Sequence, residues 1–279
     1  TLSMSDWGGH HHHDSLNLTY WKDGQELLSD LGYLADSPSA HMTTRSVAHN
    51  LVVVDEMNQQ TQGRGGSVQL FHPLGRLKAM EGASNAYHTT SLYRRFVAQV
   101  EHPGENSYVF DVFRVAGGET HDLLFHGPGQ QVQPEGIQLH PSGTQLGRYQ
   151  FSNARGGRSE DWRLRWRAGS LTFQTLAIAA QDEQVLLADG WGQRATKDPY
   201  TTLPYVIRRR STVEPVGGLP TLESQYLSVY EGYRTEPLVE SAQRLPLSGE
   251  GLTGAAGAVA AEIKAGHHTD CIISATQPA

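Results

Sequence analysis

The chain has 279 residues, of which 38% are hydrophobic, and its formal net charge at pH 7 is −7. This length is enough for one large domain or two small ones, each with a real core. The acidic balance excludes a general binder of nucleic acid or anionic membranes, and an anionic substrate would need a local basic pocket. Cys271 is the single cysteine, so no disulfide within the chain is expected.

The predicted elements, in chain order, are short apolar segments bounded by turn residues. A hairpin is predicted over 17–33, with Asp23-Gly24 as its tight turn. Residues 46–56 predict a strand whose nearly continuous apolar centre is typical of the middle of a sheet. Alternating strands are predicted at 94–102 and 107–118, around a turn at 103–106. Further strands are predicted within 161–169, 171–180, 185–192, 205–214, 222–233 and 258–275.

The fold class that follows is all-β. No segment carries a helical period of 3.6 residues over three turns, and no internal repeat is present. Regularly spaced short strands favour a large antiparallel β-sandwich over 1–279, treated as one domain. The least structured stretches, 127–147 and 190–204, are interpreted as long loops within that domain.

Four consecutive histidines stand near the start, in GGHHHHDSLNLTYW over 8–21. A remnant of a purification tag is one interpretation, but the run leads directly into a segment with a strand-like pattern. If the chain is extended from Gly9 onward, His10, His12 and Asp14 share one face. His11 and His13 then point to the other face.

Imidazole and carboxylate groups together suit zinc, but neighbouring histidines on one strand cannot complete its coordination. Asp30 and His49 are the nearby candidates, because both stand among apolar residues where a buried polar group needs a partner. Three adjacent strands would then each offer one ligand. The alternative is that His49 is a hydrogen-bonded core histidine and Asp30 a turn-capping aspartate.

A longer motif over 8–58 connects these residues. It comprises His10, His12, Asp14, Leu16, Gly24, Asp30, Gly32, Arg45, Ala48, His49, Asn50 and Asp55. In its order and spacing this motif resembles the central β domain of heparinase II/III-like polysaccharide lyases, which include the oligoalginate lyases. The segment 107–129 resembles a later strand pair of that family, with a less specific motif.

The resemblance implies a role for each matched position. His10 would face the substrate cleft as a catalytic residue, and His12, Asp30 and His49 would bind zinc. That zinc would hold the strands and loop that place His10. Arg45 would contact the substrate, although a framework arginine is an equal alternative. A one-residue slip of the histidine pair, to His11 and His13, is disfavoured by Asp14 and Leu16.

The activity implied is β-elimination on a uronic acid within an acidic polysaccharide or oligosaccharide. A base removes the C5 proton, an acid protonates the leaving oxygen at C4, and a cation neutralises the adjacent carboxylate. Histidine suits both proton transfers because its pKa lies near neutrality, and guanidinium suits the carboxylate. The family also uses a helical toroid, expected here in a longer native chain or on a companion chain.

Two other functions are compatible with the same residues. A non-catalytic carbohydrate-binding or structural β-sandwich would keep the metal without catalysis, and a zinc hydrolase would use the metal to activate water. The family implies a periplasmic or secreted protein, although the first residues lack the pattern of a signal peptide. Neither nucleic acid nor a membrane is expected as a partner.

Two groups of residues have a second interpretation as ligand contacts. Arginine clusters at 94–95 and 208–210 are interpreted as solvated residues on exposed strand faces rather than as polyanion sites. Trp162, Trp166 and Trp191 suit stacking on sugar rings, but such residues more often complete a sandwich core.

Overall fold

The computed structural model describes residues 1–4, 11–34, 40–104, 106–144, 146–197, 200–212, 222–249, 252 and 254–276. Within these ranges the regular structure is almost entirely β, as predicted. The helical elements there are α1 (Ala40–Thr43) and the 3-10 helix η1 (Ser46–Ala48). Neither has the length of a membrane-spanning helix, and none of the described residues forms one.

The described strands form four antiparallel sheets. The eight-stranded sheet consists, in spatial order, of β4 (Gly66–His72), β5 (Leu77–Ser84), β6 (Leu92–His102), β7 (Asn106–Ala116), β16 (Glu223–Tyr233), β13 (Leu171–Ile178), β12 (Asp161–Ala168) and β9 (Gln133–Glu135). The six-stranded sheet consists of β10 (His140–Pro141), β11 (Ser152–Gly157), β14 (Gln184–Trp191), β15 (Thr202–Ser211), β8 (Thr120–Phe125) and β3 (Val52–Val54). The smaller sheets are β1 (Tyr20–Lys22) with β2 (Gln25–Leu28), and β17 (Val239–Leu245), β18 (Val259–Ala265) and β19 (His268–Ser274).

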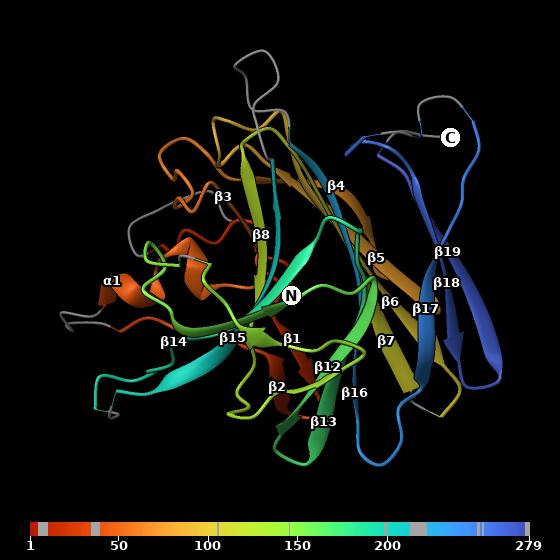
Figure 1. Ribbon diagram of the computed structural model, residues 1–279. Coiled ribbons are helices and arrows are strands. Elements are labelled where there is room, and N and C mark those ends of the chain that lie inside the picture. Colours follow the sequence, from red (N-terminus) through yellow and green to blue (C-terminus); the bar gives the residue numbers. More distant parts are fainter. Residues whose placement is uncertain are drawn as a thin grey trace.

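The sheets stack in layers, with the eight-stranded sheet in the middle. In Figure 1 the three-stranded sheet, drawn in blue, lies alongside β5–β7, and the six-stranded sheet lies on the other side. Strand β7 shows why the eight-stranded sheet can pack on both sides. Side chains alternate between the two faces of a strand, so each face of β7 presents its own set of apolar residues. Phe110 and Val112 face the three-stranded sheet, whereas Val109 and Phe113 pack toward the six-stranded sheet.

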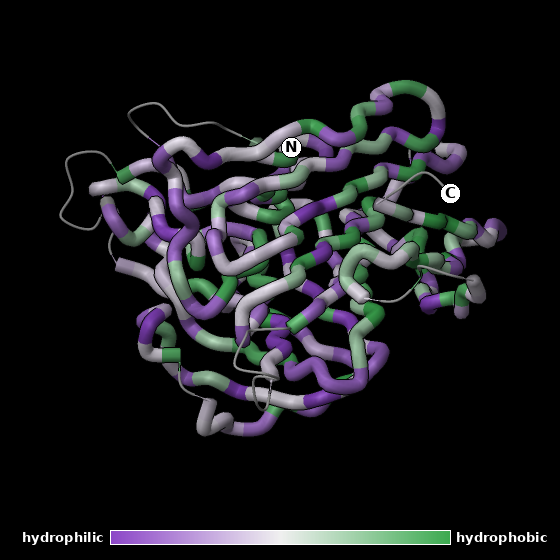
Figure 2. Tube along the Cα trace, turned by 90° about the horizontal axis from the view of Figure 1, so that it is seen from above, coloured by the Kyte–Doolittle hydropathy of each residue, from purple (hydrophilic) through white to green (hydrophobic). Residues whose placement is uncertain are grey.

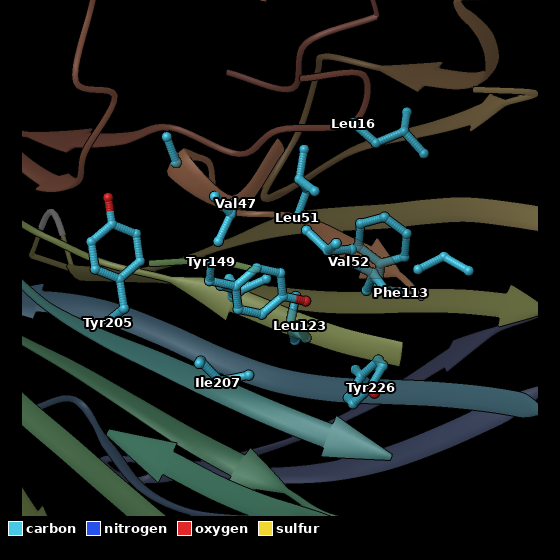
Figure 3. Close-up of a cluster of buried hydrophobic side chains, with 14 of the residues drawn as sticks. Leu16, Val47, Leu51, Val52, Phe113, Leu123, Tyr149, Tyr205, Ile207 and Tyr226 are labelled. Atoms are coloured by element: carbon cyan, nitrogen blue, oxygen red, sulfur yellow. The ribbon is translucent and has the colours of Figure 1, made fainter. Parts of the chain in front are cut away.

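The segment that precedes β3, which includes Leu16, Val47 and Leu51, packs on the six-stranded sheet. Figure 3 shows Leu16, Val47 and Leu51 from that segment above Leu123, Tyr205 and Ile207 of the sheet. In Figure 2 the hydrophobic stretches concentrate toward the interior of the molecule. Leu16 therefore anchors the described part of this segment, from residue 11 onward, to the core of the sheet.

The hairpin predicted over 17–33 is present. Strands β1 and β2 pair antiparallel, and Lys22 lies opposite Gln25 across a two-residue turn. Asp23 and Gly24 both have positive φ, +49° and +73°, as a type I′ turn requires. The hairpin places Asp30 two residues after the end of β2.

The strand predicted over 46–56 is only partly correct. It begins with η1, becomes β3 only at Val52, and lies at an edge of its sheet rather than in the middle. Ser46 donates from Oγ to the carbonyl of His13 and accepts the amide of Gln59, so polar partners outside any sheet fix this stretch. β3 is nevertheless fully buried, which explains its continuous apolar pattern.

The arginine clusters were wrongly interpreted as solvated. Arg95 and Arg208 are fully buried and bind Asp111 and Glu183, with the closest N–O contacts at 2.7 and 2.6 Å. A buried guanidinium requires such a carboxylate partner. These arginines therefore hold the sheets together and are not available to a ligand.

The remaining interpretations concern tryptophans and loops. Trp162 and Trp166 are buried in the core, and half-buried Trp191 packs against it, which is the core alternative stated above. The stretch 127–147 includes β9 and β10, so it is more regular than predicted. In the stretch 190–204, β14 ends at Trp191 and β15 begins at Thr202, and the described residues between them form a loop.

Candidate metal centre

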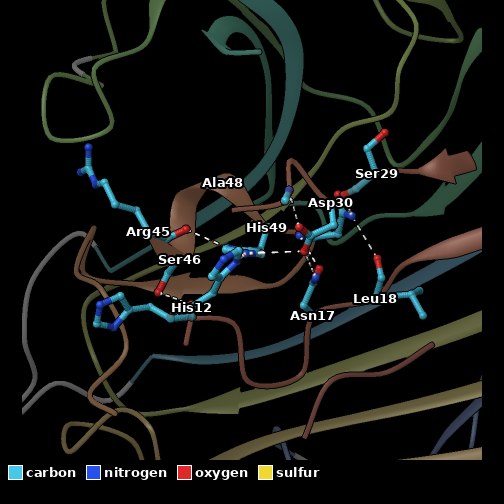
Figure 4. A network of polar contacts seen from close by, with 12 residues as sticks. His12, Asn17, Leu18, Ser29, Asp30, Arg45, Ser46, Ala48 and His49 are labelled. Atoms are coloured by element: carbon cyan, nitrogen blue, oxygen red, sulfur yellow. Dashed lines mark hydrogen bonds and ion pairs between the residues drawn. The ribbon is translucent and has the colours of Figure 1, made fainter. Parts of the chain in front are cut away.

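His12, Asp30 and His49 converge at one point of the structure. Nδ1 of His12 lies 3.0 Å from Nε2 of His49, and that Nε2 lies 3.7 Å from Oδ2 of Asp30. One ligand atom from each residue lies within 4.8 Å of the other two. Figure 4 shows the three side chains directed toward one another from separate segments.

His12 reaches this point from a loop. The described residues between 11 and 19 form no strand, so the predicted face shared by His10, His12 and Asp14 on an extended strand is wrong for that part. The next residue holds the loop in place: the amide of His13 donates to Thr44, and its ring Nδ1 lies 2.6 Å from the carbonyl of Gln59. The expectation of three adjacent strands is therefore replaced by three loop or helix-end positions.

His49 is the C-cap residue of η1, and its ring orientation is determined by a backbone contact. Its Nδ1 lies 2.8 Å from the carbonyl oxygen of Arg45. A carbonyl can only accept, so Nδ1 carries the proton and Nε2 offers its lone pair to the centre. Histidines that bind metals commonly have this second contact, which fixes the tautomer.

Asp30 is held by four hydrogen bonds, one of which runs from the Arg194 guanidinium to its carbonyl oxygen at 2.7 Å. Oδ1 accepts the amide of Gly32 at 2.8 Å, Oδ2 accepts Nδ2 of Asn17 at 3.1 Å, and its own amide donates to Glu26. The Gly32 contact makes Asp30 turn-capping as well as a member of the cluster. The alternative interpretation of Asp30 is thus compatible with the metal interpretation.

The electrostatics of the cluster favour the ligand forms of Asp30 and His12. Burial raises the pKa of Asp30, but the His49 ring, the Gly32 amide and the His12 ring outweigh it, so the net pKa lies below the usual range. Burial, followed by the His49 ring, lowers the pKa of His12. A carboxylate beside neutral imidazoles is the state that binds a metal cation.

A buried polar frame around the cluster was not predicted from the sequence. Asn50 belongs to the motif, yet no structural role was predicted for it. Its Nδ2 donates to the carbonyls of Leu18 and Ser29, and its Oδ1 accepts the amide of His126. His126 is fully buried, with Nε2 at 3.0 Å from the carbonyl of Ala48, and burial lowers its pKa to about 4. An apolar strand end, LLFHG, was the available signal for a neutral buried histidine.

Two of the three separations between donor atoms are close to those of a zinc site, and the third lies within 4.8 Å. Tetrahedral zinc with ligand atoms at 2.0–2.1 Å separates those atoms by roughly 3.3 Å. The contacts of 3.0 and 3.7 Å lie on either side of that value. Two imidazole nitrogens and one carboxylate oxygen form a common donor set for this ion. His12, Asp30 and His49 are thus able to hold zinc with a position left over.

The other predicted site residues differ in outcome. His10, the predicted catalytic residue, lies outside the described residues. Arg45 precedes η1, and burial lowers its pKa; its guanidinium donates to the carbonyl of Arg148 at 2.5 Å. Figure 4 shows its side chain extending away from His49. The structure therefore brings together the predicted metal ligands and places Arg45 at the N-cap of η1, with its side chain directed away from His49.

The sequence comparison identifies the family. A model described as heparinase II/III-like, C-terminal, matches residues 2–215. The chain belongs to the heparinase II/III-like family. The match spans His12, Asp30 and His49, and the resemblance stated from the motif is confirmed. No curated protein sequence matches the chain.

Solved structures with the same fold are also known in this family. One heparinase III aligns with a TM-score of 0.67 at 15% identity, over 98% of this chain and 38% of its own. A mutant of the heparan sulfate lyase HepC from Pedobacter heparinus aligns with a TM-score of 0.65 at 9% identity, over 96% and 37%. The chain thus spans less than two fifths of the length of these proteins. The likeness establishes the heparinase-like β-sandwich fold.

Proposed function

We propose that this domain contributes to a polysaccharide lyase that cleaves uronic-acid-containing glycans by β-elimination. The observation that supports it best is the convergence of His12, Asp30 and His49, which come from three separate parts of the family motif. Membership in the heparinase II/III-like family supplies the reaction class. Export to the periplasm or beyond the cell is part of the same proposal, because polymeric substrates lie there.

The proposed reaction breaks the C5–H and C4–O bonds and forms a C4–C5 double bond, with one proton passed to the base and one to the leaving oxygen. A base takes the proton from C5 of the uronate, the C4–O bond breaks, a double bond forms between C4 and C5, and the leaving oxygen takes a proton. We assign a proton-transfer role to His10, since imidazole both accepts and donates near neutral pH. Arg45 is proposed to face the substrate carboxylate, where positive charge stabilises the developing enolate.

Zinc, when bound, would supply a cation that crosslinks the histidine loop, the end of the β1–β2 hairpin and η1. The chain's own residues position His10 in this scheme. His12 lies two residues after it, and the contacts of His13 fix the same loop. A helical toroid, in the same chain or on a companion chain, is proposed to complete the substrate cleft.

The test is a product assay on the protein together with its helical toroid. A lyase leaves an unsaturated uronate that absorbs in the near ultraviolet, whereas a hydrolase leaves saturated ends. We expect this absorbance from the parent and its loss in His10→Ala, with zinc content unchanged. Binding of the glycan without any turnover would instead favour a non-catalytic carbohydrate-binding domain, and saturated products would favour the zinc hydrolase.

A further inference from the structure

A groove follows the segment 129–133, with β12 beside its first part and β11 and β14 beside its second. It consists of two adjoining depressions of about 500 and 670 Å³, which share Gln130, Gln131 and Gln133 in their walls. The first also contains Arg165, Arg167 and Arg234, and the second contains Arg155. Four guanidinium groups thus line one groove of a chain whose net charge is −7.

Two of these arginines have no carboxylate partner among the described residues. Arg165 pairs with Glu135 at 2.6 Å, and Arg234 pairs with Asp23 at 2.8 Å. Arg167, by contrast, donates to the hydroxyl of Thr172, and no ion pair involves Arg155 in the described part of the chain. Both side chains are exposed. Arg155 and Arg167 thus lie on the two sides of the shared glutamines without an ion pair, although the depression of Arg155 also contains Asp189.

The other groups in the groove suit a hydroxylated ligand. Glutamine side chains both donate and accept hydrogen bonds, as sugar hydroxyls do, and Tyr233 adds a half-buried aromatic ring. Asp189, the one acidic residue in the walls of these depressions, accepts from Nδ2 of Asn153 at 2.7 Å. Arginine recognises carboxylate and sulfate oxygens in bidentate geometry.

A short segment of the chain links the groove to the candidate metal centre. The carbonyl of His126 accepts the amide of Ser29, next to Asp30, and four residues later the chain reaches Gln130. Four residues span at most about 15 Å, so the groove begins within that distance of His126. Gly127 and Gly129 press against Trp166, where an added Cβ would lie 2.2 and 2.7 Å from that side chain. The segment therefore has a fixed path along the groove.

We propose that this groove is a second glycan site, which binds an acidic oligosaccharide apart from the metal centre. Arg155 and Arg167 bind its carboxylate or sulfate groups, and the glutamines bind its hydroxyls. The ligand class rests on the proposed lyase function. The binding itself requires neither the metal nor turnover.

The test measures binding to the 279-residue chain by titration calorimetry. Three probes of equal length separate the chemistry: an oligogalacturonate, which carries only carboxylates, a heparin oligosaccharide, which also carries sulfates, and a neutral cello-oligosaccharide. The double variant Arg155→Gln/Arg167→Gln is compared with Arg76→Gln/Arg158→Gln, which removes the same charge from exposed arginines elsewhere. We expect the Kd of the acidic probes to rise at least about tenfold in the first variant and less than about twofold in the second.

Each outcome bears on the proposal. Equal weakening by both double variants would mean general electrostatic attraction and would overturn it, as would equal binding of the neutral probe or the absence of binding. Preference for one acidic probe identifies the anionic group that the groove recognises. His12→Ala, which removes a metal ligand, is expected to leave groove binding unchanged. If the parent holds no zinc but binds the acidic probes through Arg155 and Arg167, the lyase proposal is weakened, whereas the proposal of a glycan site in the groove is supported.

Discussion

At the scale of single residues, the arrangement of His12, Asp30 and His49 determines what the centre can hold. The backbone carbonyl of Arg45 occupies one nitrogen of His49 and leaves the other for the cluster. Asn17 and the Gly32 amide hold the two oxygens of Asp30. His49 and Asp30 thus each have a second partner that fixes the direction of the side chain, which reduces the conformational entropy lost on binding a metal.

The first prediction concerns metal content. Purified without chelators, the parent is expected to carry about one zinc per chain, and His12→Ala and Asp30→Ala are expected to lose it, because two remaining ligands bind too weakly. Elemental mass spectrometry measures this directly. His72→Ala, which removes an exposed histidine on β4, is the matched control and should retain the metal. A parent without zinc would refute the ligand assignment.

The second prediction concerns acid stability through His121. Its ring nitrogens lie 2.7 Å from the Ser224 hydroxyl and from the Gly117 carbonyl, and burial lowers its pKa to about 4. Between that value and the unfolded pKa near 6.5, the unfolded chain binds a proton that the folded chain does not. Stability should therefore fall as the pH drops through this window, by about 2 kcal/mol for this group at pH 5.

Urea unfolding of the parent and of His121→Gln at pH 7.5 and pH 5 measures the effect. The variant should be less stable than the parent at pH 7.5, but its stability should depend less on pH. An equal pH dependence in both proteins would show that His121 does not contribute. His126, which is buried in the same way, is expected to account for a similar part of the remaining slope.

At the scale of elements, one amide side chain joins segments that are far apart in the sequence. Asn50, two residues after η1, bonds to Leu18 ahead of β1, to the residue after β2 and to the residue after β8. Its own amide donates to Asn17, and its carbonyl accepts from Arg95. All four regions surround the cluster, so this residue sets the relative positions of the metal ligands.

The third prediction is that Asn50→Ala destabilises the fold and releases the metal. Removal of its side chain leaves three buried backbone groups unpaired, at about 1–3 kcal/mol each. We expect a loss of at least about 3 kcal/mol in the free energy of unfolding, with lower zinc content. Asn106→Ala, which removes an exposed amide at the start of β7, should change stability by less than about 0.5 kcal/mol. Similar losses in both variants would argue against a special role for Asn50.

Local chemistry explains which elements were predictable. The β1–β2 turn needs positive φ at two positions, and Asp-Gly supplies it within the turn itself, so the sequence pattern was sufficient. The 3-10 turn at Ser46 depends on His13 and Gln59, residues distant in sequence, and no local pattern reveals them. The metal ligands were predicted through the family motif, whereas their loop geometry required the folded chain.

At the scale of the whole molecule, the fold extends beyond the part that matches the family model. The match ends at residue 215, yet β16, which begins at Glu223, lies between β7 and β13 in the eight-stranded sheet. β17–β19 follow and cover the outer face of that sheet. Glu231 joins the two layers: its carboxylate accepts the amides of Leu238 and Val239, which lead into β17.

The fourth prediction is that a chain ending at Thr235 folds poorly, because it keeps β16 but loses β17–β19. Phe110, Val112 and Val229 would then lose their cover, and Glu231 would lose two of its donors. We expect increased binding of a hydrophobic dye and a lower unfolding temperature than for residues 1–279. Exposure of such a continuous apolar face promotes aggregation.

A point substitution tests the same layer when the shortened chain is insoluble. Ile263 on β18 is fully buried in the core between the two sheets, so Ile263→Ala in the complete chain should cost about 2–5 kcal/mol. If the three-stranded sheet unfolded independently, this substitution would create a separate early transition and leave the main one unchanged. A single transition, shifted as a whole, would show that all three layers unfold together, so that the outer sheet also stabilises the histidine loop on the far side.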